Sequence, residues 1–221
     1  MNFDERKSHY SKCGMYNGYD KKNKEREALD YYATPPEQVY NILKELNIDF
    51  TNCSILEPCA GGGHMVQGIC SYLENKNIQQ FNLTATDIQK REQIIDFPIK
   101  TGKEYDFLSD NYPIQDIDYI IMNPPFSVIE PFVMKSLSIA NKGLVMLGRL
   151  QFLEGQNRYK KILKDFPPSE VYIYYDRISC YKNGRKVLNA DVQAYAWFYW
   201  DLTSEKKPPI IKWISREGEN K

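Results

Sequence analysis

The sequence predicts an α/β fold built on a mostly parallel, seven-stranded sheet with an antiparallel C-terminal strand. Short apolar segments alternate along the chain with segments in which apolar residues recur at helical spacing. Polar and glycine-rich clusters follow the apolar segments directly, and the C-terminal third is rich in aromatic residues. Strands that alternate with helices indicate a parallel sheet with helices on both faces.

The first expected elements are a helix, a strand and a second helix. Thr34 is a suitable N-cap, Pro35 fits the first turn, and Glu37 lies three residues after the threonine, which together form a capping box. The segment CSILEP predicts a strand that leads into the glycine turn CAGGGHM. Apolar residues then recur at helical spacing at Met65, Ile69, Tyr72 and Leu73. The glycine turn therefore joins a strand to a helix.

Three further strands and a helix complete the predicted parallel part. FNLTATD predicts a strand that ends at Asp87, YDFL a short strand or turn, and DYIIMN a strand that ends at Asn123. Apolar spacing from Ile129 to Ala140 predicts a helix, and GLVMLGRL predicts the strand after it. EVYIYYDRI and DVQAYAWFYW predict two aromatic strands of one long hairpin, separated by a basic, turn-rich segment.

Size and composition predict one domain, over residues 29–215. Residues 1–28 are polar and lack periodicity, which predicts a flexible arm, and residues 216–221 are expected to form a short tail. No apolar stretch approaches the roughly 20 residues that span a bilayer, and the N-terminus lacks the apolar segment of a signal peptide. The five cysteines are odd in number and include no C-x-x-C pair, so no disulfide framework or metal site is indicated. These features predict a cytoplasmic protein without a membrane partner.

The charges are unevenly distributed, although the formal net charge is zero. Residues 142–186 hold ten basic and four acidic residues, a net charge of +6. Residues 87–130 hold nine acidic and four basic residues, a net charge of −5. Such a division is typical of a protein with one side that faces nucleic acid, and a run of solvated helix lysines produces it as well.

The unusual polar clusters fall at the predicted carboxyl ends of strands, where ligands bind in parallel α/β sheets. These clusters are residues 57–63, 87, 106–107 and 123–126. The glycines permit positive φ and a close approach of a ligand to the backbone. A nicotinamide-type G-x-G-x-x-G pattern is excluded because Val66 holds its third glycine position, and no Walker sequence is present. Asp87 is placed to bind ribose hydroxyls, which together with the glycines favours a nucleoside ligand.

The motifs ILEPCAGGG, TATDI, YDFL and IIMNPPF occur in this order after an N-terminal ATPPE. In this conjunction they resemble the S-adenosylmethionine-dependent DNA adenine-N6 methyltransferases with the γ-like motif order. The resemblance covers residues 31–150, and RLQFLEGQNR and AYAWFYW are similar to segments of small phage or prophage members. It implies the Rossmann-like class I methyltransferase fold, S-adenosylmethionine as the cofactor, and the cytoplasm of a bacterial or phage-infected cell.

The resemblance also implies which residues contact the cofactor. Gly61 and Gly63 would border its methionine part, with Glu57 near the ammonium group and Thr34 near the carboxylate. The complete predicted set is Thr34, Glu57, Pro58, Ala60, Gly61, Gly63, Asp87, Asp106 and Phe107.

At the adenosine end, the resemblance implies that Asp87 binds the ribose hydroxyls. Asp106 would accept a hydrogen bond from the adenine amine, and Phe107 would flank the adenine ring. Cys59, which lies between these motifs, is expected to serve packing alone.

Two prolines, an amide and a ring end the strand at residues 123–126. Adjacent prolines terminate a strand on steric grounds, but the amide and the ring need another explanation. The exocyclic amine of adenine is a poor nucleophile because its lone pair is delocalised into the ring. The Asn123 side-chain oxygen and the Pro124 carbonyl would accept its hydrogens, and Pro125 would keep the turn rigid. Phe126 would stack on a base rotated out of the duplex, or pack as a core ring.

The predicted partner is DNA, with the target base flipped out of the duplex or in a single strand. The expected contacts are Arg149, Arg158, Lys182, Arg185 and Lys186. Room beyond the core is limited to the arm, residues 149–158 and the hairpin at 176–191, so we expect relaxed or short-site specificity dominated by phosphate contacts. Two alternatives remain open: an RNA or protein-glutamine methyltransferase of the same fold, and a catalytically inactive DNA-binding protein that keeps the fold as a scaffold.

Overall fold

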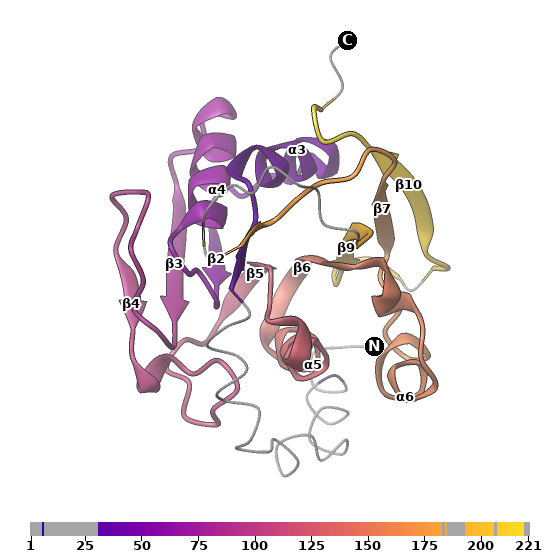
Figure 1. Cartoon of the computed structure of the whole chain (residues 1–221). Helices are drawn as coiled ribbons and strands as arrows, with labels where there is room; N and C mark the ends of the chain where they lie inside the picture. The colour runs from indigo at the N-terminus through magenta and orange to yellow at the C-terminus, as the bar shows by residue number, and fades with distance from the viewer. Residues whose placement is uncertain (1–5, 7–30, 183, 185–192, 206, 219–221) are drawn as a thin grey trace.

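The computed structural model of the chain describes residues 6, 31–182, 184, 193–205 and 207–218 (Figure 1). In this part of the chain, eight strands form one sheet in the order β10-β7-β9-β6-β5-β2-β3-β4. These strands are β2 (Cys53–Glu57), β3 (Phe81–Asp87), β4 (Ile99–Thr101), β5 (Ile117–Met122), β6 (Ala140–Arg149), β7 (Glu170–Tyr174), β9 (Tyr195–Asp201) and β10 (Ile210–Ile214).

Among these eight strands, β9 runs against the direction of the other seven. It lies between β6 and β7 and pairs antiparallel with both, so the predicted pairing of the two aromatic strands is confirmed. The chain passes from β2 outward through β3 to β4, and β5 then pairs with the other side of β2. Chain order therefore reverses between β2 and β5. The architecture agrees with the predicted α/β fold and its mostly parallel sheet.

Helices cover both faces of the sheet (Figure 1). The helices α3 (Pro36–Leu46) and α4 (His64–Asn75) cover one face, while α5 (Ile129–Ile139) and α6 (Gln156–Arg158) lie on the other side of the sheet. Because consecutive strand residues point to opposite faces, Ile121 packs in the core with α3 and α4, whereas Ile120 and Met122 pack in the core with α5. Burial on both faces accounts for the continuous apolar runs of β5 and β6.

A separate two-stranded ribbon connects distant parts of the chain. Its strands β1 (Tyr32–Ala33) and β8 (Tyr181–Lys182) pair antiparallel. The first strand directly precedes α3, and the second lies in the connection between β7 and β9. The ribbon therefore ties the chain before the first helix to the C-terminal third.

In the described part of the chain the sheet has eight strands rather than the predicted seven, because the two edge strands β4 and β10 escaped the sequence analysis and the YDFL segment is a turn rather than a strand. The strand β4 has only three residues and β10 follows two prolines, so neither offers the long apolar run of a central strand. The antiparallel strand β9 is consequently not the last strand, and β10 pairs in parallel with β7. Short edge strands with little apolar burial are typical of open sheets.

The predicted capping box at the start of α3 is wrong. The helix begins at Pro36 with Pro35 as its N-cap, and no side chain caps it. Thr34 lies one residue too early to reach the amides of the first turn. Its hydroxyl oxygen is buried and has no hydrogen-bond partner among the described residues.

The two predicted chain ends are described to different extents. The arm at residues 1–28 lies outside the described residues, apart from residue 6. In the predicted tail, the Arg216 carbonyl oxygen accepts a hydrogen bond from Gln38 Nε2 at 2.7 Å, so this part of the chain packs against α3. Within the described ranges, no helix is both long enough and apolar enough to cross a membrane.

Candidate functional site

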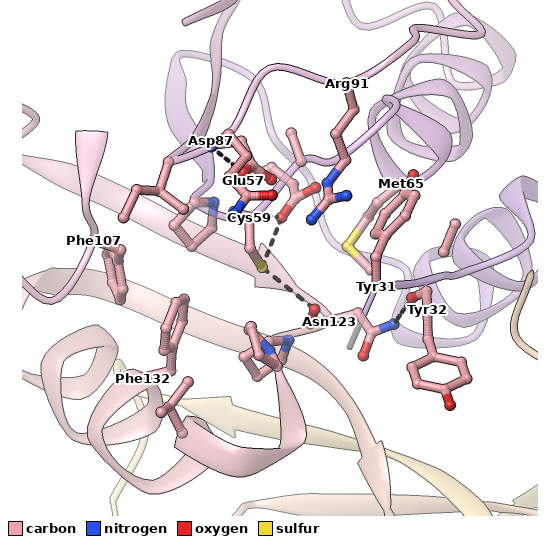
Figure 2. A pocket seen from close by; sticks show the side chains of 18 of the residues that line it. Tyr31, Tyr32, Glu57, Cys59, Met65, Asp87, Arg91, Phe107, Asn123 and Phe132 are labelled. Atoms are coloured by element: carbon pink, nitrogen blue, oxygen red, sulfur yellow. Dashed lines mark hydrogen bonds between the residues drawn. The ribbon is translucent and has the colours of Figure 1, made fainter. Parts of the chain in front are cut away.

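A cavity of about 200 Å³ opens at the carboxyl ends of β2, β3 and β5 (Figure 2). Chain order reverses at this point, which is the usual position of a ligand in an open parallel sheet. Of the residues predicted from the sequence, those that line the cavity are Thr34, Glu57, Pro58, Ala60, Asp87, Asp106, Phe107, Asn123, Pro124, Pro125 and Phe126. The fold thus brings the predicted cofactor and catalytic residues to one place, with Gly61 and Gly63 as the exceptions.

The glycine turn is closed by hydrogen bonds within the protein. Gly61 and Gly63 have φ values of 55° and 89°, in the left-handed region that favours glycine. The Gly61 amide donates to Asp87 Oδ2 at 2.8 Å, the Gly62 amide to the Tyr31 hydroxyl at 2.8 Å, and the Gly63 amide to a carbonyl of the same turn at 2.8 Å. A side chain at Gly61 would overlap the Tyr31 ring. Tyr31 therefore covers the turn, and the three glycine amides of the turn already donate hydrogen bonds within the protein.

Asp87 is fixed at the end of β3 by two backbone donors. Its Oδ2 accepts from the Gly61 amide and its Oδ1 accepts from the Gln89 amide, each at 2.8 Å. Burial raises the pKa of Asp87, while these two hydrogen bonds and the positive charge of Arg91 oppose the rise. A carboxylate oxygen can accept more than one hydrogen bond, so both oxygens can still accept from ligand hydroxyls.

Glu57 is buried at the end of β2, beside Cys59. Its Oε1 accepts from the Cys59 amide at 3.1 Å and from the Cys59 thiol at 3.3 Å. Burial raises the pKa of Glu57 to about 8, against the effect of these two donors. The same thiol lies 3.4 Å from the Asn123 carbonyl oxygen. Cys59 therefore connects the ends of β2 and β5, beyond the packing role expected from the sequence.

Asp106 and Phe107 lie in a loop that is packed firmly against α5. Asp106 Oδ1 accepts from the backbone amide two residues later, at 3.1 Å. The Phe107 ring is buried, with its centroid 5.0 Å from that of Phe132. Lys135 Nζ donates to the Ser109 carbonyl at 2.6 Å and lies 5.5 Å from the Phe107 centroid. These contacts hold the predicted adenine-binding loop in place.

Asn123 is held by one end of its side-chain amide, and the other end is unpaired. Its Nδ2 donates to the Tyr32 carbonyl at 2.7 Å. Its Oδ1 is buried and has no hydrogen-bond partner among the described residues. Because the amide is planar, the bond to Tyr32 also fixes the direction of Oδ1 (Figure 2). A buried acceptor without a donor costs roughly 1–3 kcal/mol, which a ligand that donates to it can recover.

Phe126 belongs to an aromatic cluster beside the diproline turn. It begins a 3₁₀ turn, Phe126–Val128, directly after Pro125. Its ring centroid lies 6.0 Å from that of Tyr32 and 6.0 Å from that of Tyr195. The guanidinium carbon of Arg149 lies 4.5 Å from the Phe126 centroid. The ring thus both packs and lines the cavity, and stacking on a base stays a prediction.

The five predicted DNA contacts are placed unequally. Arg149 is beside the cavity, on Phe126. Arg158 is engaged within the protein, because its Nε donates to Glu130 at 3.2 Å and its Nη1 donates to three carbonyls. Lys182 pairs in β8, while Arg185 and Lys186 lie outside the described residues. Their role with DNA stays a prediction.

Among the cavity-lining residues that the sequence analysis did not predict, three bear on the chemistry of the site. Tyr31 and Tyr32 line the cavity just ahead of the ATPPE motif, and Arg91 reaches it from the loop after β3. Arg91 packs its guanidinium on the Tyr31 ring, with 4.3 Å between the guanidinium carbon and the ring centroid. These contacts join parts of the chain that are far apart, so no local spacing indicates them.

Comparisons with known proteins gave likenesses in structure alone: no family model and no curated protein matches the sequence. A Listeria monocytogenes protein, provisionally described as a class I S-adenosylmethionine-dependent methyltransferase, aligns with a TM-score of 0.56 and 12% identity over 97% of this chain and 73% of its own. A type I restriction-modification methyltransferase subunit from Streptococcus thermophilus aligns with a TM-score of 0.60 and 11% identity over 83% and 47%. A Pyrococcus horikoshii protein, provisionally described as an RNA methyltransferase, aligns with a TM-score of 0.55 and 16% identity over 78% and 88%.

These likenesses confirm the predicted fold class, since the chain shares its α/β architecture with three proteins described as methyltransferases. At such low identity they show the fold alone, because one fold hosts many reactions. This chain spans about half the length of the Streptococcus thermophilus subunit.

Proposed function

We propose that this protein transfers the methyl group of S-adenosylmethionine to the N6 amine of adenine in DNA. The observation that carries the proposal is the Asn123 side-chain amide, whose Nδ2 is held by the Tyr32 carbonyl while Oδ1 is buried without a donor among the described residues. An acceptor oriented in this way, at the end of a strand and beside a cavity, fits an amine that has hydrogens to donate. The order of the sequence motifs and the shared fold of class I methyltransferases support the same assignment.

The residues of the cavity fit the chemical parts of S-adenosylmethionine. Asp87 presents a fixed carboxylate for the ribose hydroxyls, as in other nucleoside-binding α/β folds. Phe107 offers a buried ring for the adenine, and Asp106 lies next to it on the cavity wall. Glu57 provides a buried carboxyl group for the ammonium group, and the Thr34 hydroxyl, which has no partner among the described residues, can donate to a carboxylate.

The protein's contribution to transfer is to prepare the amine. When bound, S-adenosylmethionine supplies a methyl group on a sulfonium, and the amine nitrogen bonds to that carbon as the sulfur–carbon bond breaks. Asn123 Oδ1 and the Pro124 carbonyl accept the amine hydrogens, which favours a pyramidal nitrogen with an available lone pair. Pro125 fixes the backbone at φ −54°, so that both acceptors keep their direction. No strong base is needed, because the nitrogen becomes cationic when it gains the methyl group and then gives its proton to solvent water.

DNA is the substrate class that the site favours. Phe126 lines the cavity beside Asn123 and carries a ring on which a flipped base can stack. Arg149 lies on the same ring, where its charge can also contact the phosphate of the flipped nucleotide. One of the proteins that share the fold is a methyltransferase subunit of a restriction-modification system. We further propose relaxed or short-site specificity, in which phosphate contacts dominate and binding weakens steeply with salt.

A labelling experiment tests the proposal. The purified protein is incubated with methyl-labelled S-adenosylmethionine and separate pools of duplex DNA, RNA and protein, and the labelled product is digested to nucleosides or amino acids. We expect label in N6-methyldeoxyadenosine, and loss of this label in Asn123→Ala.

Each alternative gives a different result in the same experiment. Label confined to RNA or to glutamine would assign the site to another acceptor of the same fold. Retention of cofactor and DNA binding without any transfer would indicate an inactive DNA-binding protein. Sequencing of the methylated DNA then measures the specificity, and one long recognition sequence modified to completion would contradict relaxed recognition.

A further inference from the structure

The donors near the covered glycine turn suggest how the amino-acid end of the cofactor is recognised. In many nucleotide-binding folds, free amides at such a turn and the start of the next helix bind an anion. Here the amides of Gly61, Gly62 and Gly63 all donate within the protein. The ring of Tyr31 also covers the turn. An anionic group in this cavity therefore needs a donor other than the turn.

Arg91 is the cation that the cavity offers at this position. It reaches the cavity from the loop after β3, and Figure 2 shows its side chain extending toward Tyr31, Glu57 and Cys59. Its Nε is buried and has no hydrogen-bond partner among the described residues. Its guanidinium carbon lies 4.3 Å from the Tyr31 centroid, and the Tyr31 hydroxyl is in turn bonded to the Gly62 amide. Stacking on an anchored ring holds the guanidinium in place and leaves its N–H donors free.

A second donor lines the same cavity. The Thr34 hydroxyl is buried without a partner among the described residues, and it lines the cavity together with Arg91. Two buried carboxylates, Glu57 and Asp87, also line this cavity. The cavity thus offers acceptors for an ammonium group and unpaired donors for a carboxylate. This is the complement of an α-amino acid.

We propose that Arg91, stacked on Tyr31, binds the carboxylate of the methionine part of the cofactor and makes the site selective for ligands that carry this group. The inference rests on the proposed function and deepens it. Arginine suits the role because its planar fork matches the two oxygens of a carboxylate. Thr34 then donates a second, neutral hydrogen bond to the same group.

A minimal pair of ligands tests the proposal by binding alone. S-adenosylmethionine and its decarboxylated form differ only in the carboxylate, and calorimetric titration measures the affinity of each. We expect Arg91→Met to lower the affinity for S-adenosylmethionine by about 10- to 100-fold. The affinity for the decarboxylated ligand should change by less than about threefold. Arg91→Lys should lie between Met and wild type for S-adenosylmethionine, because it keeps the charge and loses the fork. Lys90→Met, which removes an exposed charge next to Arg91, is the matched control and should bind both ligands like wild type.

The outcomes separate the proposal from its premise. Equal weakening of both ligands in Arg91→Met would show that Arg91 serves only the protein's own carboxylates or the shape of the cavity, and would overturn the inference. Unchanged binding of S-adenosylmethionine by Arg91→Met would overturn it as well, with the proposed function intact. If the wild-type protein binds neither ligand, the proposed function itself fails. Thermal unfolding of the ligand-free variants confirms that each one is folded.

Discussion

Two regions of the cavity differ in how fully their polar atoms are paired. At the proposed ribose end, formed by Asp87 and the glycine turn at residues 61–63, both carboxylate oxygens and all three amides have partners within the protein. Elsewhere on the cavity wall, three side chains that we group as the proposed transfer end, Thr34, Arg91 and Asn123, each have a buried polar atom without a partner among the described residues. The first region is complete without a ligand, and the second is not.

The polar atoms of the two regions contribute to different properties, the stability of the fold and the binding of a ligand. Paired atoms at the ribose end stabilise the fold and set the shape that a ligand must match. Unpaired buried atoms destabilise the free protein, so their presence is best explained by what they bind. Substitutions at the ribose end should therefore weaken folding and binding together, whereas those at the transfer end should weaken function with little loss of stability.

The largest effect is expected at the transfer end. Asn123→Ala should lower methyl transfer by about 10²–10³-fold, because one of the two acceptors for the amine is lost. Affinity for S-adenosylmethionine should stay within about threefold, since Asn123 is not expected to contact it strongly. Single-turnover transfer to duplex DNA and calorimetric titration measure the two quantities.

Asn82→Ala, at an exposed position on β3, is the control and should change neither quantity. A loss of cofactor binding in Asn123→Ala would remove the distinction between the two regions. Unimpaired transfer would refute the role of Asn123.

The next largest effect is expected at the ribose end. Asp87→Ala should weaken the cofactor by about 10- to 100-fold, because charge-assisted hydrogen bonds to the ribose are lost. It should also lower the free energy of unfolding by about 1–3 kcal/mol, since the buried Gly61 amide loses its acceptor. Urea unfolding and calorimetric titration test this pairing of effects. A variant that loses affinity at unchanged stability would show that the ribose end is not held by these bonds.

The affinity for the cofactor should depend on pH because the pKa of Glu57 is raised. Burial raises the pKa of Glu57 from 4.5 to about 8, so the folded protein keeps a proton that the unfolded chain releases between these values. The stability contributed by neutral Glu57 is therefore fully present below about pH 4.5 and is lost as the pH rises toward about 8. The cofactor ammonium favours the charged form, so its affinity should rise with pH up to about 8, by at most about tenfold per pH unit.

Titrations in two buffers of different ionisation enthalpy check this expectation, because binding should release a proton below about pH 8. Glu57→Gln cannot release a proton and should show a flatter profile. An equally steep profile in that variant would assign the titration to another group.

The smallest effect on cofactor affinity is expected at Thr34. Thr34→Val replaces the unpaired hydroxyl by a methyl group of similar shape. It should lower the affinity for S-adenosylmethionine about three- to tenfold. The free energy of unfolding should equal that of the wild type or exceed it by up to about 1 kcal/mol. Chemical unfolding with and without ligand measures both. A clear loss of stability in the ligand-free protein would mean that the hydroxyl is paired after all.

Sequence reasoning predicted the central sheet and the residues at its carboxyl ends, because both depend on local patterns. Apolar runs buried on two faces marked β5 and β6, and polar residues directly after β2, β3 and β5 marked the cavity. It failed at the edges, where β4 and β10 have little apolar surface to bury. It also failed at Thr34. The predicted capping box needs Thr34 as the N-cap, but the helix begins one residue later, with Pro35 as its N-cap.

The missed part of the site depends on contacts that sequence spacing does not encode. Tyr32 holds Asn123 through its backbone carbonyl, which any residue would offer, so no side-chain pattern marks it. Arg91 and Tyr31 meet across a tertiary contact between a loop and a segment far earlier in the chain. Gly61 and Gly63 were expected on the cavity wall, and no local pattern indicates that Tyr31 covers the turn.

The ribbon of β1 and β8 lies outside the main sheet and helps to orient the Asn123 side-chain amide. Asn123 takes its direction from Tyr32, a residue of β1, and β1 is paired with a strand that opens into the basic segment of the C-terminal third. A chain that began after this strand would keep all eight strands of the sheet and would lose the carbonyl that aims the amide. The main sheet and the orientation of the proposed acceptor therefore depend on different segments of the chain.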